Sequence, residues 1–355
     1  NRIRPPRPRI YSNTTAKPKP YAIPMLRFTA HRLFGLLVTM FFVSIMVFTI
    51  MELPPGDYAD RYAFRKYSGT GVNVTQGDID NIRRDFGLDQ PAWQRYLQWI
   101  GGIVTRFDFG ESFAYETSVN HVIGQRLWMT LAILYATLIL TYLLSIPIAI
   151  YAAVNRHSVV DYSLTVASYL GLALPNFLLA LIMLYISVTI FGTSIGGLFS
   201  PELEKAPWSI AKLVDMLKHL IIPAVVLSWS ATALQLQTVR ATMLDELNKL
   251  SVTAARARGI PEWKLLLKYP ARLAVNPVVS TMGFDVNRIF SELPIVALVL
   301  GLPELGELLI QSYLDLDMYV AGAILLMLTF FIVVMNFISD VALAALDPRI
   351  TLEGA

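Results

Sequence analysis

The sequence predicts an all-α membrane protein with six transmembrane helices, and three observations support this prediction. Hydrophobic residues make up 55% of the 355 residues and charged residues only 15%, whereas soluble domains carry about 25% charged residues. Several uncharged stretches reach the roughly 20 residues that a helix needs to cross a bilayer. Lysine and arginine gather in short segments on one side of these stretches, as they do in cytoplasmic loops.

Four of the six predicted spans contain no charged residue. They comprise 19, 29, 21 and 22 residues, at 33–51, 127–155, 219–239 and 318–339. Two further spans are predicted at about 162–191 and at about 273–300. Glycines beyond residue 191 indicate a loop there. Prolines within or near the spans are expected to bend their helices: Pro147, Pro175, Pro223, Pro277 and Pro294.

The basic residues predict the orientation of the chain. Eight lysines and arginines precede the first span before any acidic residue, and seven more lie in the 240–272 loop. The short loops on the other side, 191–218 and 301–316, carry three between them. Because basic loops stay in the cytoplasm, both termini and the 240–272 loop are predicted to be cytoplasmic.

The spans divide the chain into four parts. We predict a basic cytoplasmic tail over 1–28, a first transmembrane helix over 29–51, an external helical insertion over 52–126, and a core with the other five spans over 127–348. The tail is too long for a secretory signal and no cleavage site follows the first span, so we predict that it is not removed. Its basic, proline-rich composition is typical of an extended segment that touches anionic lipid.

Two helices are predicted in the insertion. Thr75 and Asp78 have the spacing of a capping box, and Gly87 suits the C-terminus of the helix that follows. A second helix is predicted from near Pro91, with apolar residues at helical spacing that should form its buried face: Trp93, Tyr96, Leu97, Ile100 and Val104. The insertion could be a folded loop over the spans or a docking surface for an external protein, and both interpretations can hold.

The 240–272 loop is predicted to form a helical hairpin. The first helix would run from Thr242 to Arg258 and end at Gly259, and Pro261 suits the first turn of a second helix. Small alanines between Thr253 and Gly259 allow another backbone to approach closely, and arginines there can bind carboxylates. The residues alone fit either a docking element for a cytoplasmic partner or a solvated basic hairpin.

Several motifs occur in a fixed order along the chain. The first span ends in Leu53-Pro54-Pro55-Gly56-Asp57, and the insertion holds Phe86-Gly87-Leu88-Asp89-Gln90-Pro91 and Asp108-Phe109-Gly110-Glu111-Ser112-Phe113. Thr253 to Gly259 lies in the basic loop, and Gly301-Leu302-Pro303-Glu304-Leu305-Gly306 follows the fifth span. Over about residues 25–350 the chain thereby resembles the permease subunits of bacterial ABC importers, in the dipeptide, oligopeptide and nickel branch.

The resemblance implies a type I importer in the bacterial inner membrane, which works by alternating access. Two related permeases would form the pore, two cytoplasmic ATPase subunits would supply ATP and Mg²⁺ binding, and an external solute-binding protein would deliver the solute. No cofactor or enzymatic activity is expected in this chain, which has no Walker A pattern. The solute would be an oligopeptide, although Pro54-Pro55 is similar to a subgroup associated partly with oligosaccharides.

The family's EAA-type coupling motif corresponds to the basic loop. Gly259 matches the glycine of the motif, and Thr253 stands where many permeases have an acidic residue, which this branch commonly lacks. The resemblance therefore implies that six residues contact the ATPase subunits: Thr253, Ala254, Ala255, Arg256, Arg258 and Gly259.

Three charged residues interrupt the fifth span. Asp285, Arg288 and Glu292 fall within about 60° of one helix face. A charge at membrane depth costs at least about 2.5–3.5 kcal/mol and normally faces water or a partner. The three residues could line the translocation path, or they could form an ion-pair ladder that locks this helix against the second permease.

Other classes of protein fit the sequence less well. A secondary transporter or channel that is not driven by ATP is the main alternative, but the chain lacks the two similar halves expected of a transporter. The four histidines lack the spacing of metal ligands, no span carries a convincing catalytic set, and there are no cysteines. A net charge of +3 gives no reason to expect nucleic acid as a partner.

Overall fold

A computed structural model describes residues 22–53, 59, 62–63, 75–85, 87–190, 196–200 and 202–346, and helices dominate it. The helices are α1 (Ala22–Glu52), α3 (Gln76–Asp85), α4 (Ala92–Arg106), α5 (Val119–Val154), α6 (Val159–Ala173), α7 (Asn176–Ile190), α8 (Ile210–Leu247), α9 (Leu250–Ala257), α10 (Glu262–Lys268), α11 (Pro270–Ala274), α12 (Asn276–Leu300), α13 (Leu305–Leu314) and α14 (Met318–Leu346). Two short antiparallel strands, β1 (Glu111–Ser112) and β2 (Thr117–Ser118), precede α5. The Pro54-Pro55-Gly56-Asp57 motif and Phe86 lie outside the described residues, as does most of the predicted tail.

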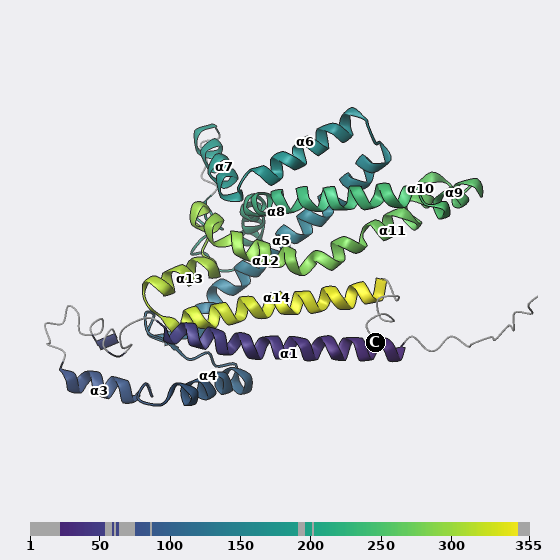
Figure 1. Ribbon diagram of the computed structural model, residues 1–355. Helices are drawn as coiled ribbons and strands as arrows, with labels where there is room; N and C mark the ends of the chain where they lie inside the picture. The colour runs from purple at the N-terminus through teal and green to yellow at the C-terminus, as the bar shows by residue number, and fades with distance from the viewer. Residues whose placement is uncertain are drawn as a thin grey trace, which may run out of the picture.

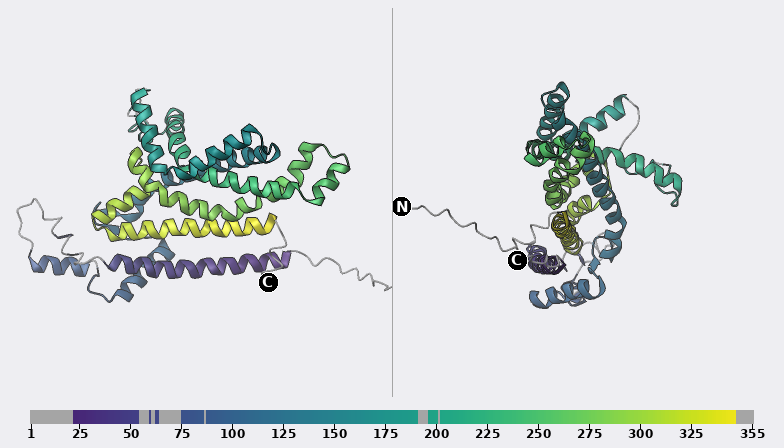
Figure 2. Two further views of the ribbon diagram at one scale, coloured as in Figure 1. Left: turned by 45° about the horizontal axis from the view of Figure 1, so that its top comes forward. Right: turned by 90° about the vertical axis from the view of Figure 1, so that its right-hand side faces the viewer.

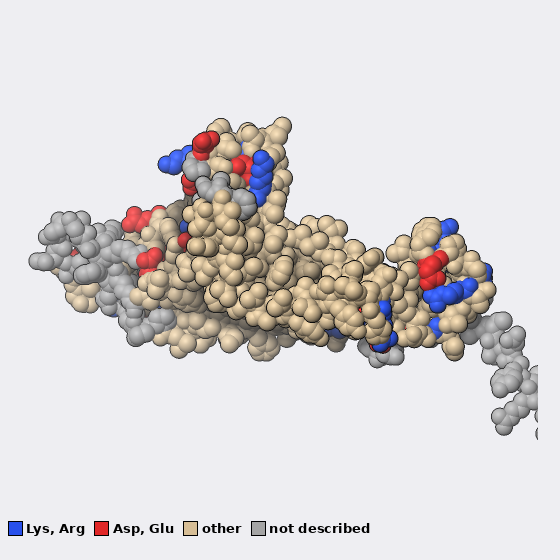
Figure 3. All heavy atoms as spheres, turned by 90° about the horizontal axis from the view of Figure 1, so that it is seen from above, with Lys and Arg blue, Asp and Glu red and all other residues tan. Residues whose placement is uncertain are grey.

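The long helices form an elongated bundle with two different ends (Figure 1). The short helices α9, α10 and α11 lie at one end, which we call the loop end, and α3 and α4 lie towards the opposite one, the insertion end (Figures 1 and 2). Figure 3 shows an uncharged band across the middle of one face, with charged side chains gathered on either side of it. This distribution is typical of a bundle that crosses a bilayer along its long axis.

Three helices are long and apolar enough to cross a membrane, namely Met25–Glu52, Val119–Val154 and Met318–Leu346. Two further candidates are bent pairs of helices, α6 with α7 and α12 with α13. If each pair is counted as one span, the number of candidate spans rises from three to as many as five. The remaining predicted span, 219–239, lies in α8, a continuous helix that is not among these candidates. The structure therefore supports a helical membrane fold with three to five candidate spans.

Prolines mark several of the departures from straight helices. Pro175 follows the end of α6, where the chain turns by 101° into α7, so the predicted span 162–191 is a bent pair. Pro147, Pro223 and Pro294 lie inside their helices, and Pro277 occupies the first turn of α12, where a missing N–H costs no hydrogen bond.

Small side chains allow the core helices to pack closely. On α5, Thr137, Thr141 and Ser145 recur every four residues and are fully buried, as expected where two membrane helices approach closely. On α12, a Cβ atom on Gly283 would lie 1.5 Å from Oδ1 of Asn336 on α14, so any larger residue would have to displace the Asn336 side chain. Gly283 therefore lets α12 and α14 approach closely.

The insertion begins as predicted. Oδ2 of Asp78 accepts hydrogen bonds from the backbone N–H of Thr75 (3.0 Å) and from its hydroxyl (2.6 Å), and the N–H of Asp78 lies 3.4 Å from the Thr75 hydroxyl, so the capping box is confirmed. Gly87 has a positive φ of 63°, as the end of the helix requires.

The predicted buried face of α4 is confirmed at Tyr96 and Ile100, which are partly buried, and wrong at the other three positions. The helix starts at Ala92, as expected, but Trp93, Leu97 and Val104 are 61%, 56% and 70% exposed. The buried face carries Trp99, with partly buried Tyr96, and packs on α1 and α14. Apolar periodicity identifies the face that avoids water, and in a membrane protein that face can contact lipid instead of protein.

Candidate functional site

The 240–272 loop lies between α8 and α12 and extends from the bundle at the loop end (Figure 1). The prediction of one helix over 242–258 is wrong in detail, because α8 ends at Leu247 and α9 starts at Leu250. At this break, Nζ of Lys249 binds Oε1 of Glu246 at 2.6 Å. The break lets α9 leave the axis of α8, so the loop is a separate helical hairpin rather than a straight continuation of α8.

Gly259 closes α9 as the sequence predicts. Its φ is +74°, and the N–H groups of Gly259 and Ile260 donate to the carbonyls of Arg256 (3.0 Å) and Ala255 (3.4 Å). This is the Schellman arrangement, in which glycine is favoured because its left-handed backbone carries no Cβ penalty. The chain then reverses into α10 after Pro261.

The hairpin has a small core of its own. Val252, Ala255 and Leu265 are buried together, with partly buried Ile260 packed against them. Ala255 is therefore enclosed within the hairpin, whereas the other residues predicted for the coupling motif are exposed, namely Thr253, Ala254, Arg256, Arg258 and Gly259. The structure thus gives these six residues two kinds of environment, one packed and one open to a partner.

An ion pair joins the two helices of the hairpin. Arg256 contacts Glu262 through two atom pairs, Nη2 to Oε1 at 2.5 Å and Nε to Oε2 at 3.1 Å. The guanidinium lowers the pKa of the Glu262 carboxyl, and the carboxylate raises the pKa of Arg256. Since both side chains are about half exposed, the pair mainly fixes the geometry of the turn and adds little stability.

The charged residues of α12 divide into two groups. Asp285 is 3% exposed, and its Oδ2 accepts hydrogen bonds of 2.7 Å from the hydroxyl of Tyr142 on α5 and from Nε2 of Gln235 on α8. Gln235 also donates to Thr281 at 3.0 Å. Asp285 therefore ties three helices together within the bundle.

Arg288 and Glu292 form the second group. Nε of Arg288 donates to Oε1 of Glu292 at 3.1 Å, and Nδ2 of Asn176 on α7 donates to Oε2 of the same carboxylate. Both charged side chains remain 31% exposed. Among the described residues no ion pair joins Asp285 to Arg288, so the three charges do not form a single continuous ladder.

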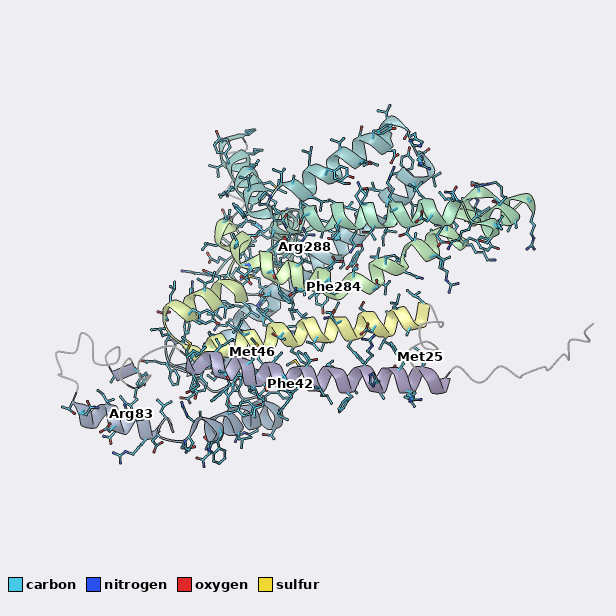
Figure 4. All side chains as sticks on the ribbon, viewed as in Figure 1. Met25, Phe42, Met46, Arg83, Phe284 and Arg288 are labelled. Atoms are coloured by element: carbon cyan, nitrogen blue, oxygen red, sulfur yellow. The ribbon has the colours of Figure 1, made fainter. Side chains whose placement is uncertain are left out.

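Figure 4 marks Phe284 and Arg288 on α12, between the two ends of the bundle. Phe284 is 72% exposed, and Asn287 and Ser291 share the exposed side of this helix. The sequence patterns did not single out Asn287 and Ser291, nor the partners Tyr142, Gln235 and Asn176. Polar residues inside apolar spans are the signal that could have found them.

Comparison with known proteins identifies the family. Residues 145–352 match the family described as binding-protein-dependent transport system inner membrane component, and residues 25–134 match its N-terminal domain. The chain belongs to this permease family. A protein named as a peptide permease in Brucella suis is 33% identical over 92% of the chain and 99% of its own length.

Two further relatives extend the comparison. The oligopeptide transport system permease AppB of Bacillus subtilis is 32% identical over 87% of this permease and 94% of its own length. The glutathione transport system permease GsiC of Escherichia coli is 29% identical over 92% and 99%. The chain is therefore a permease subunit and not an enzyme, and a secondary transporter or channel is not favoured.

Family membership also defines the setting of this permease. It is an inner membrane component of a transport system that depends on a binding protein, which implies a solute-binding protein and an ATPase as partners. Within the described residues, histidine and acidic side chains form no group of three that could hold a metal ion.

Proposed function

We propose that this permease imports oligopeptides or similar small peptides, driven by ATP hydrolysis in two cytoplasmic ATPase subunits that bind the 240–272 hairpin. The observation that carries the proposal is the hairpin itself, which is closed by Gly259 and presents Arg256 and Arg258 beside small residues at one end of the bundle. The names of its relatives, peptide, oligopeptide and glutathione permeases, support a peptide solute.

The proposed orientation places the loop end and both termini in the cytoplasm and the insertion end outside. The excess of lysine and arginine in the tail and in the 240–272 loop supports it. In this arrangement α8 also crosses the membrane and brings the number of spans to six, and the solute-binding protein docks at the insertion end. ATP and Mg²⁺ would bind to the ATPase subunits, and a second related permease would complete the pore.

The hairpin would act as a lever on the pore helices. It continues from α8 through the break at 248–249 and leads through α11 directly into α12. Away from the hairpin, within the bundle, Nε2 of Gln235 on α8 donates a hydrogen bond of 2.7 Å to Asp285 on α12. A movement imposed on the hairpin would therefore reach both helices, and the buried bond would keep them moving together.

The translocation path would run along the exposed side of α12. Arg288 and Glu292 are partly exposed and offer both signs of charge, which suits a peptide with an ammonium and a carboxylate terminus. Asn287 and Ser291 add hydrogen-bonding groups on the same helix. Asp285, in contrast, would position the helices and not touch the solute, since it is buried.

Reconstitution tests the proposal. The permease would be purified with the second permease and the ATPase subunits of its transport system, placed in liposomes, and supplied with the solute-binding protein and short peptides. We expect uptake of peptides that requires ATP hydrolysis, with no uptake of oligosaccharides of similar size. Peptide uptake that continues unchanged without nucleotide would contradict the proposal, as would import of oligosaccharides alone.

A further inference from the structure

A buried ion pair joins α6 to α8. Nε and Nη2 of Arg240 donate to Oδ1 and Oδ2 of Asp161, at 2.6 and 2.8 Å. Such a two-point contact between a guanidinium and a carboxylate is strong and allows little change of geometry. The side chain of Asp161 is 2% exposed and that of Arg240 is 20% exposed. The pair therefore fixes the start of α6 on α8, and it has no part in the lever described above.

The first turn of α6 is built around Asp161. Its Oδ2 also accepts the backbone N–H of His157 at 3.0 Å. Its own N–H donates to the hydroxyl of Ser158 at 3.1 Å, and this contact caps the helix. The carboxylate is thus held by the turn between α5 and α6 as well as by Arg240. A displacement of Arg240 would be passed directly to the start of α6.

Arg240 lies on the part of α8 that leads to the hairpin. It precedes the end of α8 at Leu247 by seven residues, which is about 10 Å of helix. The hairpin follows after the break at 248–249, and α6 begins on the side of the bundle that faces the loop end (Figure 1). The ion pair is therefore close to the place where a force on the hairpin would enter the bundle.

A second contact ties α6 to α8 farther from the hairpin. A Cβ atom on Gly171 would lie 3.0 Å from Cβ of Ala233 and 3.2 Å from Nε1 of Trp229, so the two helices approach closely there. Gly171 follows Asp161 by ten residues. Because two attachment points prevent a helix from pivoting on either one, α6 is fixed to α8 along most of its length.

The far end of α6 leads to a charged residue of the proposed translocation path. The chain turns by 101° from α6 into α7, and Asn176 is the first residue of α7. Its Nδ2 donates to the carbonyl of Leu227 on α8 at 3.4 Å and to the carboxylate of Glu292 on α12. A displacement of α6 would therefore reach Glu292 by a route that does not include the bond between Gln235 and Asp285.

Stability alone is a weak reason for a buried ion pair. Taking two charges out of water costs about as much free energy as their attraction returns, so packed apolar residues at 161 and 240 would often be equally stable. The pair instead provides a fixed geometry, whereas apolar surfaces tolerate sliding. Such a geometry is required if α8 is displaced in each transport cycle and α6 has to follow it.

We infer that Asp161 and Arg240 are positioning residues for transport. Their ion pair makes α6 follow the hairpin end of α8 when the ATPase subunits move the hairpin. The movement continues through the turn at Pro175 to Asn176, which is bonded to Glu292. The position of the Glu292 carboxylate is thereby tied to the position of the hairpin. The inference rests on the proposed function, in which the hairpin receives the force of the ATPase subunits.

The ratio of peptide imported to ATP hydrolysed tests this inference, in liposomes that hold the assembled importer. Asp161→Asn keeps the size of the side chain and removes its charge. We expect the ratio to fall at least about fivefold, the lower end of the usual coupling between two sites, because ATP is still hydrolysed while α6 no longer follows α8. Arg240→Gln should behave in the same way. Arg240→Lys, which keeps the charge but not the two-point contact, should lower the ratio less.

The ratio separates a positioning role from a purely structural one. A variant that only lowers the amount of folded importer reduces uptake and hydrolysis equally, so its ratio stays at the wild-type value. Ser158→Ala is the matched control, because it removes the cap of α6 and leaves the ion pair. It should lower the melting temperature and change the ratio less than about twofold. Arg32→Gln, which breaks the 3.0 Å ion pair between α1 and Asp340 on α14, should also leave the ratio within about twofold.

A double variant protects the test against a failure to fold. Asp161→Asn leaves the charge of Arg240 without its partner, which can destabilise the importer. Asp161→Asn combined with Arg240→Met removes both charges, so it should assemble and show the same fall in the ratio.

Two outcomes would overturn the inference alone. In the first, the wild type couples uptake to hydrolysis and the variants at 161 and 240 keep its ratio. In the second, Ser158→Ala or Arg32→Gln lowers the ratio as much as these variants do. A wild type that hydrolyses ATP without importing peptides would overturn the proposed function and this inference with it, so the wild type distinguishes the two failures.

Discussion

Replacing Gly259 by valine tests the hairpin more sharply than any other single change. Gly259 has φ +74°, and no atom lies within 4 Å of the position that a Cβ would take. The substitution therefore causes no clash, and its effect comes from the backbone alone. A left-handed conformation costs an ordinary residue about 1–2 kcal/mol, and a β-branched residue falls at the upper end of that range.

The expected consequence follows from this strain. If the ATPase subunits bind only the closed hairpin, 2 kcal/mol lowers their apparent affinity by at most about 30-fold, and by less if the wild-type hairpin is far more stable closed than open. The assay is a titration of detergent-purified permease with ATPase subunits, followed by uptake in liposomes. Gly259→Asn is the control, because asparagine tolerates the left-handed region and should lose much less. Equal affinity and uptake for wild type, Gly259→Val and Gly259→Asn would refute the reasoning.

Three further predictions concern the charged residues. Asp285→Ala should destabilise the permease by about 2–4 kcal/mol, because two buried donors lose their acceptor at once. Asp285→Asn should destabilise it less. Equal melting temperatures for the two variants would contradict this prediction. The double variant Arg288→Gln with Glu292→Gln should assemble normally and should lower peptide uptake at least as much as Arg288→Gln alone. If the double variant lowers uptake less than Arg288→Gln alone, the two residues form a purely structural pair. The pair of Arg256 with Glu262 should stabilise the hairpin at neutral pH and lose this effect as pH falls, because the pKa of Glu262 is lowered on folding. The difference in melting temperature between wild type and Glu262→Gln, which should be small for an exposed pair, should therefore persist from pH 7 to about pH 4.5 and shrink as the pH falls below that value, and a difference that stays constant down to about pH 3 would contradict the assignment.

Local signals in the sequence predicted local structure well. The capping box at Thr75 and the reversal at Gly259 each depend on a few neighbouring residues, and both are confirmed by hydrogen bonds and backbone angles. The break between α8 and α9 was missed because Asn248 and Lys249 are tolerated inside helices and give no strong stop signal.

Contacts between distant segments were beyond the reach of sequence patterns. Helical spacing correctly predicted polar residues on one side of the fifth span, but the partners of Asp285 lie 143 and 50 residues away, on α5 and α8. Only the packing of these helices decides which acid is buried and which stays partly exposed.

The error at α4 has a general physical cause. The periodicity of Trp93, Leu97 and Val104 describes a real apolar face, and the structure leaves that face open. Lipid and protein cores both favour apolar side chains, so periodicity alone does not distinguish them. Trp99, which packs on α1, fell outside the stripe that the spacing selected.

The side of the membrane on which the hairpin lies is the central claim, and the absence of cysteine from the chain makes it directly measurable. A single Arg258→Cys substitution in the permease, in membranes without its ATPase subunits, would be exposed to a membrane-impermeant thiol reagent, in spheroplasts and in inverted membrane vesicles to which the ATPase subunits can then be added. We predict labelling only in inverted vesicles, and protection when the ATPase subunits are bound. Labelling in intact spheroplasts, or labelling of inverted vesicles that the ATPase subunits do not affect, would contradict the claim.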